Sequence, residues 1–245
     1  MRTTDRSARR PVWQFVAFLL VLAAVCALLS FFSPRPDAQT QAPAAIPTLS
    51  GRTVVLDAGH GGEDGGAISV SGSYEKDLNL QIALLVADQL HANGISVILT
   101  RDRDVLLYDP ASDHVGHKKE QDLAARRKLA EDTENCIFVS IHMNAFPQSK
   151  YRGLQVWYSP NHPHSATLAQ SVQSTVRTYL QPQNARRTKA ASQSIYLLHY
   201  LQVPAVLIEC GFLSNPDEAA LLDSPAYRHR LALLISLSIL QAETA

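Results

Sequence analysis

Two histidines and two glutamates stand out first, because their side chains can bind metal and move protons. His60 follows a short apolar run and lies among glycines in VVLDAGHGGEDGGA, whereas His142 ends the apolar run CIFVSIH. Glu75 opens the segment EKDLNLQIALLVADQLHAN, and Glu209 lies inside AVLIEC. Two imidazoles and one carboxylate form a common zinc triad that leaves a fourth position open for water. His60, Glu75 and His142 are therefore candidate zinc ligands.

The second glutamate suits a different task. Zinc lowers the pKa of a bound water to about 7. A carboxylate that does not bind the metal can take the proton of this water and pass it to a leaving amine. Glu209 is flanked by apolar residues and by Cys210, and such surroundings raise the pKa of a carboxyl group. We therefore expect Glu209 to act as the catalytic base and acid.

The glycines around the first histidine have a geometric explanation. Five of the eleven glycines in the chain lie within the stretch that contains His60. Gly59, Gly61 and Gly62 allow the backbone to turn sharply, because glycine lacks a Cβ atom. We expect them to leave open space beside His60.

Each of these residues also has a structural interpretation. A histidine at the end of a strand can simply be hydrogen-bonded in place, and a glutamate such as Glu75 is common at a helix start because of the helix dipole. Glu209 could pair with a buried base. Asn144, two residues after His142, could contact substrate or form a turn. Spacing alone leaves these alternatives open.

The elements that would position these side chains alternate between strand and helix. Short apolar runs predict strands, and segments with apolar residues at helical spacing predict helices. The expected strands are 52–57, 95–100, 136–142, 154–159 and 205–210, and the expected helices are 75–93, 118–132, 164–180, 216–222 and 225–241. This alternation predicts a single α/β domain, with helices on both faces of a mostly parallel sheet. In such sheets, ligands gather at the carboxyl ends of the strands.

Other candidate residues receive a structural interpretation. Arg126 and Arg127 lie in a charged helical segment, where a solvated helix face is the simplest expectation. Cys136 and Cys210 lie in apolar strand-like runs and are expected to be buried free thiols. No CxxC pair exists in the sequence, which argues against a zinc site made of cysteines.

The N-terminal part of the chain differs from the rest. Residues 12–32 carry no charge and follow four arginines; about 20 apolar residues suffice to cross a bilayer. We expect a cytoplasmic tail (1–11), a transmembrane anchor (12–32), a proline-containing flexible linker (33–50) and a catalytic domain (51–245) outside the cell membrane. A cleaved signal peptide and a secreted domain are the alternative. The 22 basic and 22 acidic side chains balance, so charge gives no argument for a nucleic-acid partner.

Four ordered blocks carry a resemblance to a known family. LDAGHGGEDGGA, YEKDLNL, VSIHMNA and PAVLIECGFLSNPDEAALL resemble the signature blocks of the zinc-dependent N-acetylmuramoyl-L-alanine amidases, and the likeness covers essentially residues 52–241. The resemblance implies that His60, Glu75 and His142 bind one zinc ion per chain and that Glu209 is catalytic. One position departs from the family pattern: many members have proline directly before the first glycine of the first block, and this chain has Ala58 there.

The resemblance also implies a substrate and a pathway. The family cleaves peptidoglycan at the amide between N-acetylmuramic acid and L-alanine. This sequence is most similar to germination-specific, spore-cortex members, which implies a step in muramic-δ-lactam formation together with a peptidoglycan deacetylase. A cell-separation or wall-turnover amidase, a zinc peptidase that cuts within the stem peptide, and a non-catalytic peptidoglycan-binding module are the alternatives.

Overall fold

The computed structural model describes residues 15–18, 20–21, 51–108 and 117–242. The chain divides into two units, Met1–Ala45 and Ile46–Ala245. In the first unit, the described residues are helical. The expected tail and linker, and most of the expected anchor, lie outside the described residues. Among the helices that the structure does describe, none combines the length and the apolar character that crossing a membrane requires.

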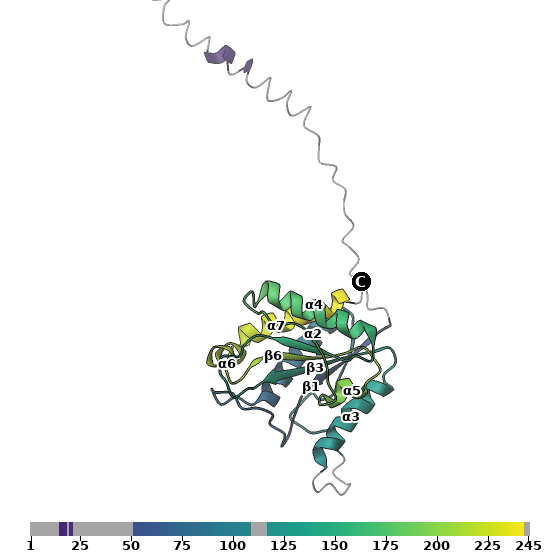
Figure 1. The fold of residues 1–245 in the computed structure, drawn as a ribbon. Helices are drawn as coiled ribbons and strands as arrows, with labels where there is room; N and C mark the ends of the chain where they lie inside the picture. The colour runs from purple at the N-terminus through teal and green to yellow at the C-terminus, as the bar shows by residue number, and fades with distance from the viewer. Residues whose placement is uncertain (1–14, 19, 22–50, 109–116, 243–245) are drawn as a thin grey trace, which may run out of the picture. The chain divides into compact units, whose positions relative to one another are not determined.

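A six-stranded sheet lies at the centre of the second unit (Figure 1). Its strands are β1 (Thr53–Ala58), β2 (Ser96–Leu99), β3 (Cys136–Asn144), β4 (Gln155–Tyr158), β5 (Lys189–Ala190) and β6 (Ala205–Phe212). They follow the order β2-β1-β3-β6-β4-β5. β4 runs antiparallel to β6, and the other neighbouring pairs are parallel. The expectation of a mostly parallel sheet is therefore confirmed.

Helices cover both faces of this sheet, as expected (Figure 1). They are α2 (Glu75–Ala92), α3 (Lys118–Asp132), α4 (Pro163–Tyr179), α5 (Tyr196–Tyr200), α6 (Pro216–Asp223) and α7 (Pro225–Ala242). α2, α4 and α7 pack on one face, whereas α3 and α5 pack on the other. Two elements were not expected: β5 has two residues and α5 has five. Segments this short carry too few residues to show a periodic pattern.

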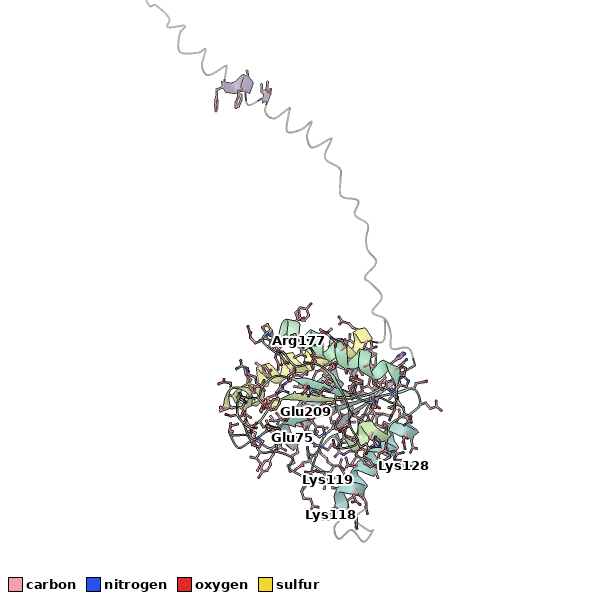
Figure 2. All side chains as sticks on the ribbon, viewed as in Figure 1. Glu75, Lys118, Lys119, Lys128, Arg177 and Glu209 are labelled. Carbon is pink, nitrogen blue, oxygen red and sulfur yellow. The ribbon has the colours of Figure 1, made fainter. Side chains whose placement is uncertain are left out.

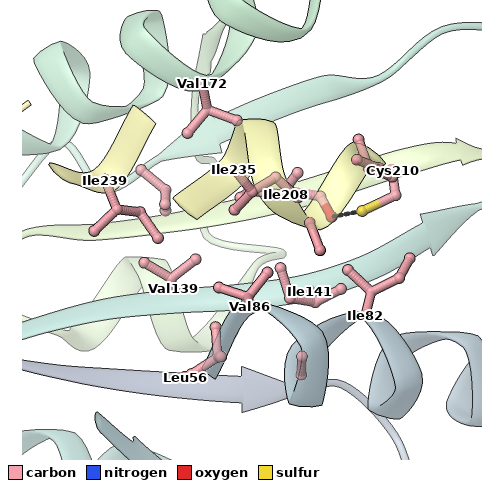
Figure 3. Packing of buried hydrophobic residues seen from close by; sticks show 14 of the residues in the cluster. Leu56, Ile82, Val86, Val139, Ile141, Val172, Ile208, Cys210, Ile235 and Ile239 are labelled. Carbon is pink, nitrogen blue, oxygen red and sulfur yellow. Dashed lines mark hydrogen bonds between the residues drawn. The ribbon is translucent and has the colours of Figure 1, made fainter. Parts of the chain in front are cut away.

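The main hydrophobic core lies between the sheet and α2, α4 and α7 (Figure 3). Successive side chains of a strand point to opposite faces. Val139 and Ile141 of β3 and Ile208 of β6 thus project into this core, where each is fully buried. A smaller cluster on the other face includes Phe138 and Leu198. The two clusters fix the sheet between its helices.

Both cysteines in the described domain are buried and free, as expected. Cys136 belongs to the smaller cluster and Cys210 to the main core. The Sγ atom of Cys210 lies 3.8 Å from the carbonyl oxygen of Ile208 (Figure 3). Burial raises the pKa of the Cys136 thiol to about 12 and raises that of Cys210 as well, so both remain protonated at neutral pH.

Candidate active site

The carboxylate of Glu75 lies close to the rings of both histidines that were predicted as ligands. Its Oε1 atom lies 3.2 Å from Nε2 of His60 and 3.0 Å from Nδ1 of His142. The candidate ligand atoms of the three residues all lie within 4.8 Å of one another. His60 follows β1, Glu75 begins α2, and His142 lies in β3. The fold therefore brings together three side chains that are far apart in the sequence.

The geometry of this cluster fits a tetrahedral metal ion. Two donors that each lie about 2.0–2.1 Å from a tetrahedral zinc ion are about 3.3 Å apart. The distances from the Glu75 carboxylate to the two imidazoles, 3.2 and 3.0 Å, are close to this value. Two nitrogens and one carboxylate oxygen also match the donor set of catalytic zinc sites, in which a fourth position stays open. The residues present therefore suit zinc.

The backbone holds the Glu75 carboxylate in place. Its Oε2 atom accepts a hydrogen bond from the N–H of Ala67 (2.9 Å), and Oε1 accepts one from the N–H of Met143 (3.1 Å). Burial acts to raise the pKa of Glu75, but the hydrogen bonds from His142 and His60 outweigh it and lower this pKa well below its usual range. Glu75 is consequently ionised at neutral pH, as a metal ligand must be.

A second carboxylate orients the first histidine. Oδ2 of Asp64 lies 2.9 Å from Nδ1 of His60, so that Nε2 is left facing Glu75. A carboxylate behind a ligating imidazole fixes the orientation of the ring. His60 itself has φ 63°, in the left-handed region that non-glycine residues seldom adopt. Asp64 was not among the residues expected from the sequence, although an acid four residues after His60 in the same glycine-rich turn was a visible signal.

Two glycines make room for the ligands, but not at the positions expected from the sequence. A Cβ atom on Gly59 would lie 2.2 Å from Nε2 of His142, so Gly59 leaves space beside His142 and not beside His60. Space beside His60 comes from Gly66, where a Cβ atom would lie 2.9 Å from Cδ2 of His60 and 2.6 Å from Oε2 of Glu75. The expected sharp turn is confirmed, since Gly61 and Gly62 have positive φ. The expected space beside His60 was assigned to the wrong glycine, because the sequence does not show that His142 of β3 lies against Gly59.

Glu209 lies opposite His142 in the parallel pairing of β3 and β6. Both Glu209 and Glu75 are labelled in Figure 2. Its Oε2 atom is buried and has no hydrogen-bond partner among the residues that the structure describes. Burial raises the pKa of Glu209 to about 7, while His142 and His60 act to lower it and Glu75 acts to raise it. This carboxyl group can therefore gain or lose a proton near neutral pH, which suits general acid–base catalysis.

Asn144 is the last residue of β3. Its carbonyl oxygen accepts a hydrogen bond from the N–H of Leu213 (2.8 Å), and it pairs with Phe212. Three residues of β3, from His142 to Asn144, lie opposite four residues of β6, from Glu209 to Phe212, so β6 contains a bulge here. Asn144 belongs to a strand and not to a turn, and its contact with substrate stays a prediction.

Arg126 contradicts the expectation of a solvated helix face. It is 1% exposed, and its guanidinium group donates hydrogen bonds to Asp57 (2.6 Å) and Asp122 (2.8 Å). It also donates to the carbonyl oxygens of Ala58 and His60, both at 2.8 Å. The physical reason is the carboxylate of Asp57, which ends up buried under α3 and needs a positive partner. Arg126 therefore fixes the turn that carries His60.

Part of this arrangement was visible in the sequence. Asp122 and Arg126 are four residues apart on one helix, a spacing at which side chains meet. The contact with Asp57 joins residues that are 69 apart in the chain, and no local pattern indicates it. Arg127, by contrast, is partly exposed and pairs with Glu131 at 2.7 Å, as a residue on a solvated face does.

Comparison with known proteins identifies the family. Residues 54–241 match the family model described as N-acetylmuramoyl-L-alanine amidase. Because the match extends over most of the chain, the protein belongs to this family. The resemblance of the four sequence blocks is thereby confirmed.

Three individual amidases are similar to this chain over most of its length. The chain is 38% identical over 193 residues to the germination-specific N-acetylmuramoyl-L-alanine amidase of Bacillus subtilis (strain 168), which covers 79% of this chain and 80% of the relative. The solved CwlD amidase of Clostridioides difficile, in complex with the GerS lipoprotein, has a TM-score of 0.75 at 37% identity and covers 79% of this chain and 98% of its own. The amidase AmiC2 of Nostoc punctiforme has a TM-score of 0.67 at 30% identity, with the same coverages.

Proposed function

We propose that this protein hydrolyses the amide between N-acetylmuramic acid and L-alanine in peptidoglycan, with one zinc ion held by His60, Glu75 and His142. The main support for this proposal is the position of the Glu75 carboxylate, which lies 3.2 Å from the imidazole of His60 and 3.0 Å from that of His142. Membership of the amidase family supports the choice of the bond that is cleaved.

Zinc, when bound, supplies polarisation of the scissile carbonyl group and activation of a water molecule. The protein supplies the remaining requirements. Asp64 and the backbone N–H groups of Ala67 and Met143 keep the ligands in place. Because the ligands are fixed before substrate arrives, little reorganisation is needed during the reaction.

Glu209 moves the proton in this proposal. Its carboxylate accepts a proton from the attacking water and then donates it to the nitrogen of L-alanine as the C–N bond breaks. The products are a lactyl carboxylate on the sugar and a peptide with a free amino terminus. A pKa of about 7 supports both halves of this role, because neither protonation state is strongly favoured at neutral pH.

Product analysis on defined muropeptides tests the proposed bond. The amidase reaction gives a free lactyl carboxylate and an N-terminal L-alanine. A zinc peptidase would release fragments of the stem peptide, and a non-catalytic binding module would give no product. Either of these two results would refute the proposal.

Metal analysis tests the proposed ligands. The purified protein is expected to contain about one zinc ion, because the described residues hold one group of three suitable ligands. His142→Ala is expected to lose both zinc and activity. His91→Ala is the matched control, since His91 is an exposed residue in the last turn of α2. Active protein without metal would contradict the proposed site.

We further propose that the cleavage serves spore-cortex formation. Similarity to the germination-specific amidase of Bacillus subtilis supports this. A muramic lactam needs a free lactyl carboxylate to meet a free 2-amine; an amidase exposes the first group and a deacetylase exposes the second. Deleting the gene in a spore-forming host is then expected to remove muramic-δ-lactam from the cortex. Normal lactam together with unseparated vegetative cells would indicate a cell-separation amidase instead.

We also propose that residues 12–32 anchor the protein in the cell membrane, with the catalytic domain on the outer side. The absence of charge in this run and the arginines before it support the proposal. The full chain is expected to stay with membranes through salt and alkaline washes, whereas a fragment that starts at Gly51 is expected to be soluble. A mature protein that starts near residue 40 would show that the segment is cleaved and the domain secreted.

A further inference from the structure

Arg186 is linked through one side chain to the strand that carries Glu209. It lies in the loop between α4 and β5, and its Nη1 atom donates a hydrogen bond to Oε1 of Gln155 (3.0 Å). Gln155 pairs with Glu209 across the antiparallel strands β4 and β6. Side chains of residues directly opposite each other project from the same face of a sheet. Arg186 therefore reaches the face of the sheet that carries Glu209.

The guanidinium group is held in a fixed position. Its Nε atom donates a hydrogen bond to the carbonyl oxygen of Arg152 (2.7 Å). Its central carbon lies 4.3 Å from the centroid of the Phe212 ring and 6.0 Å from that of Tyr151. Arginine stacks on aromatic rings in this way, and it presents its N–H groups in a rigid fork. The orientation of Arg186 is thus set before any ligand binds.

This cation has no ion-pair partner in the described parts of the chain. Arg126, on the same face of the sheet, is paired with two carboxylates, whereas no carboxylate in the described ranges lies within ion-pair distance of Arg186. Burial lowers the pKa of Arg186, and the nearby carboxylate of Glu218 acts against this shift. The two oxygens of Glu218 are already occupied, since they accept hydrogen bonds from the N–H groups of Gly153 and Phe212, both at 2.8 Å.

One atom of the fork remains available. Nη2 of Arg186 donates no hydrogen bond to any residue that the structure describes, whereas Nη1 and Nε do. Nη2 is not among the fully buried side-chain atoms that lack a partner in the described residues, so a ligand can reach it. Arg186 is therefore ready to accept an anionic group from outside the chain.

Arg186 also lines a cavity of about 660 Å³. Binding sites for small molecules have volumes in this range. The lining contains three cations, Lys150, Arg152 and Arg186, and two acids, Asp217 and Glu218. Since Glu218 is bound to the backbone, the cavity favours a ligand with negative charge near Arg186.

We propose that Arg186 binds the first free carboxylate of the stem peptide, which is the α-carboxylate of a γ-linked glutamate in the second position. The cavity then holds the peptide residues that follow. This inference rests on the proposed amidase function and names a specificity-determining residue for it. By holding the leaving peptide on one side of the scissile amide, Arg186 aligns the L-alanine nitrogen with Glu209. A carboxylate–guanidinium contact is strong and directional, which suits this positioning.

A matched pair of substrates tests the proposal on the full-length zinc-loaded protein. Two muramoyl tetrapeptides differ only at the second residue, which carries either a free α-carboxylate or a carboxamide. The protein is expected to cleave the carboxylate form with a kcat/KM about 10-fold higher or more, since hydrogen bonds to charged groups contribute about that much. The difference is expected in KM, because the contact forms in the bound substrate, and also in kcat, because the contact aligns the scissile amide.

Variants assign this preference to Arg186. Arg186→Gln is expected to lower kcat/KM for the carboxylate substrate by about 10-fold and to leave the carboxamide substrate nearly unchanged. Arg186→Lys keeps the charge without the fork, so a reduced preference is expected. Arg187→Gln is the matched control: it removes a positive charge from an exposed neighbouring side chain, and the wild-type preference is expected to persist.

The outcomes separate this proposal from the function on which it rests. If the wild-type protein cleaves both substrates equally well, or if Arg186→Gln lowers both rates by the same factor, the role of Arg186 is wrong and the amidase function stands. If the wild-type protein cleaves neither substrate at the amide, the proposed function fails and the role of Arg186 fails with it. Even if a variant does not fold, equal cleavage of the two substrates by the wild-type protein would refute the role of Arg186.

Discussion

The two faces of the central sheet are made from alternate residues of the same strands, yet they differ in chemistry. On β3, Val139 and Ile141 face α2, α4 and α7 and are fully buried in the main core. Their neighbours Phe138, Ser140 and His142 project to the other face, which changes from apolar to polar toward the carboxyl end of the strand. One face of β3 is therefore apolar and stabilises the fold along the whole strand. The other face carries polar side chains at the carboxyl end of the strand.

β6 has the same pattern, and its polar end contains a carboxylate whose burial is unfavourable. Ile208 and Cys210 belong to the main core. Between them, Glu209 keeps a buried carboxylate oxygen without a partner among the described residues. Burying such a group is unfavourable, and strained or unsatisfied groups are typical of functional sites. The comparison predicts that substitutions at the polar end mainly change activity, whereas substitutions on the apolar face mainly change stability.

Glu209→Gln is expected to have the largest effect on activity while the fold and the zinc content are retained. The amide is nearly the same size as the carboxylate but cannot accept the proton, and general acid–base groups contribute about 10²–10⁴-fold. Turnover and zinc content are measured together, with the exposed Glu134→Gln as control. A near-normal rate at normal zinc content would remove Glu209 from the mechanism.

Arg126→Met is expected to lower the free energy of unfolding by about 3–5 kcal/mol, because it leaves the buried carboxylate of Asp57 without its positive partner. This substitution tests the contrast between the faces, since Arg126 lies on the polar side but is expected to stabilise the fold. Urea unfolding of the metal-free protein gives the value. The neighbouring Arg127→Met is the control, and equal losses in both variants would contradict a special role for the buried pair.

The stability of the metal-free protein is expected to depend on pH through Glu209. The pKa of Glu209 is raised to about 7 in the folded protein, against about 4.3 in an unfolded chain. Stability is therefore greatest below the unfolded value and is lost as pH rises through about 7. Glu209→Gln lacks this dependence, so relative to wild type it is expected to gain on the order of 2 kcal/mol between pH 5 and pH 8.

Unfolding measured with a metal chelator at these two pH values checks this expectation. A difference between the two proteins that stays constant from pH 5 to pH 8 would show that the pKa of Glu209 is not raised by folding.

Ile208→Val is expected to have the smallest effect. It removes one methylene group from the main core next to Glu209, which costs about 0.5–1.5 kcal/mol. Activity per folded molecule is expected to be unchanged, because the side chain points away from the site. Thermal unfolding and kcat are compared with those of Leu233→Val, whose site on α7 is 48% exposed. A loss of kcat larger than that caused by the control would show that the two faces are coupled.

Much of the fold was predictable because its elements have local causes. The expected 118–132 helix coincides with α3, and the other expected elements begin and end within two residues of those observed. The antiparallel direction of β4 was not predictable, since the run that forms it has no feature that sets its orientation. It matters for the site, because this direction pairs Gln155 with Glu209.

The sequence by itself determined which residues are available for the chemistry and which end of the sheet they occupy. His60, Glu75, His142 and Glu209 each adjoin or lie within a segment with a clear local pattern. It also indicated the raised pKa of Glu209, because the residues next to it in the chain are apolar.

Only the tertiary structure decided how these residues are held and what surrounds them. Four features depend on contacts between segments or on the exact path of a turn: the burial of Arg126, the support of His60 by Asp64, the space beside His142 and the position of Arg186. The physical reason is that burial and electrostatic pairing are set by distance in space, whereas a sequence pattern reports only the neighbours along one element. A charged residue that looks solvated on its own helix becomes a buried counter-ion when another strand ends beneath it.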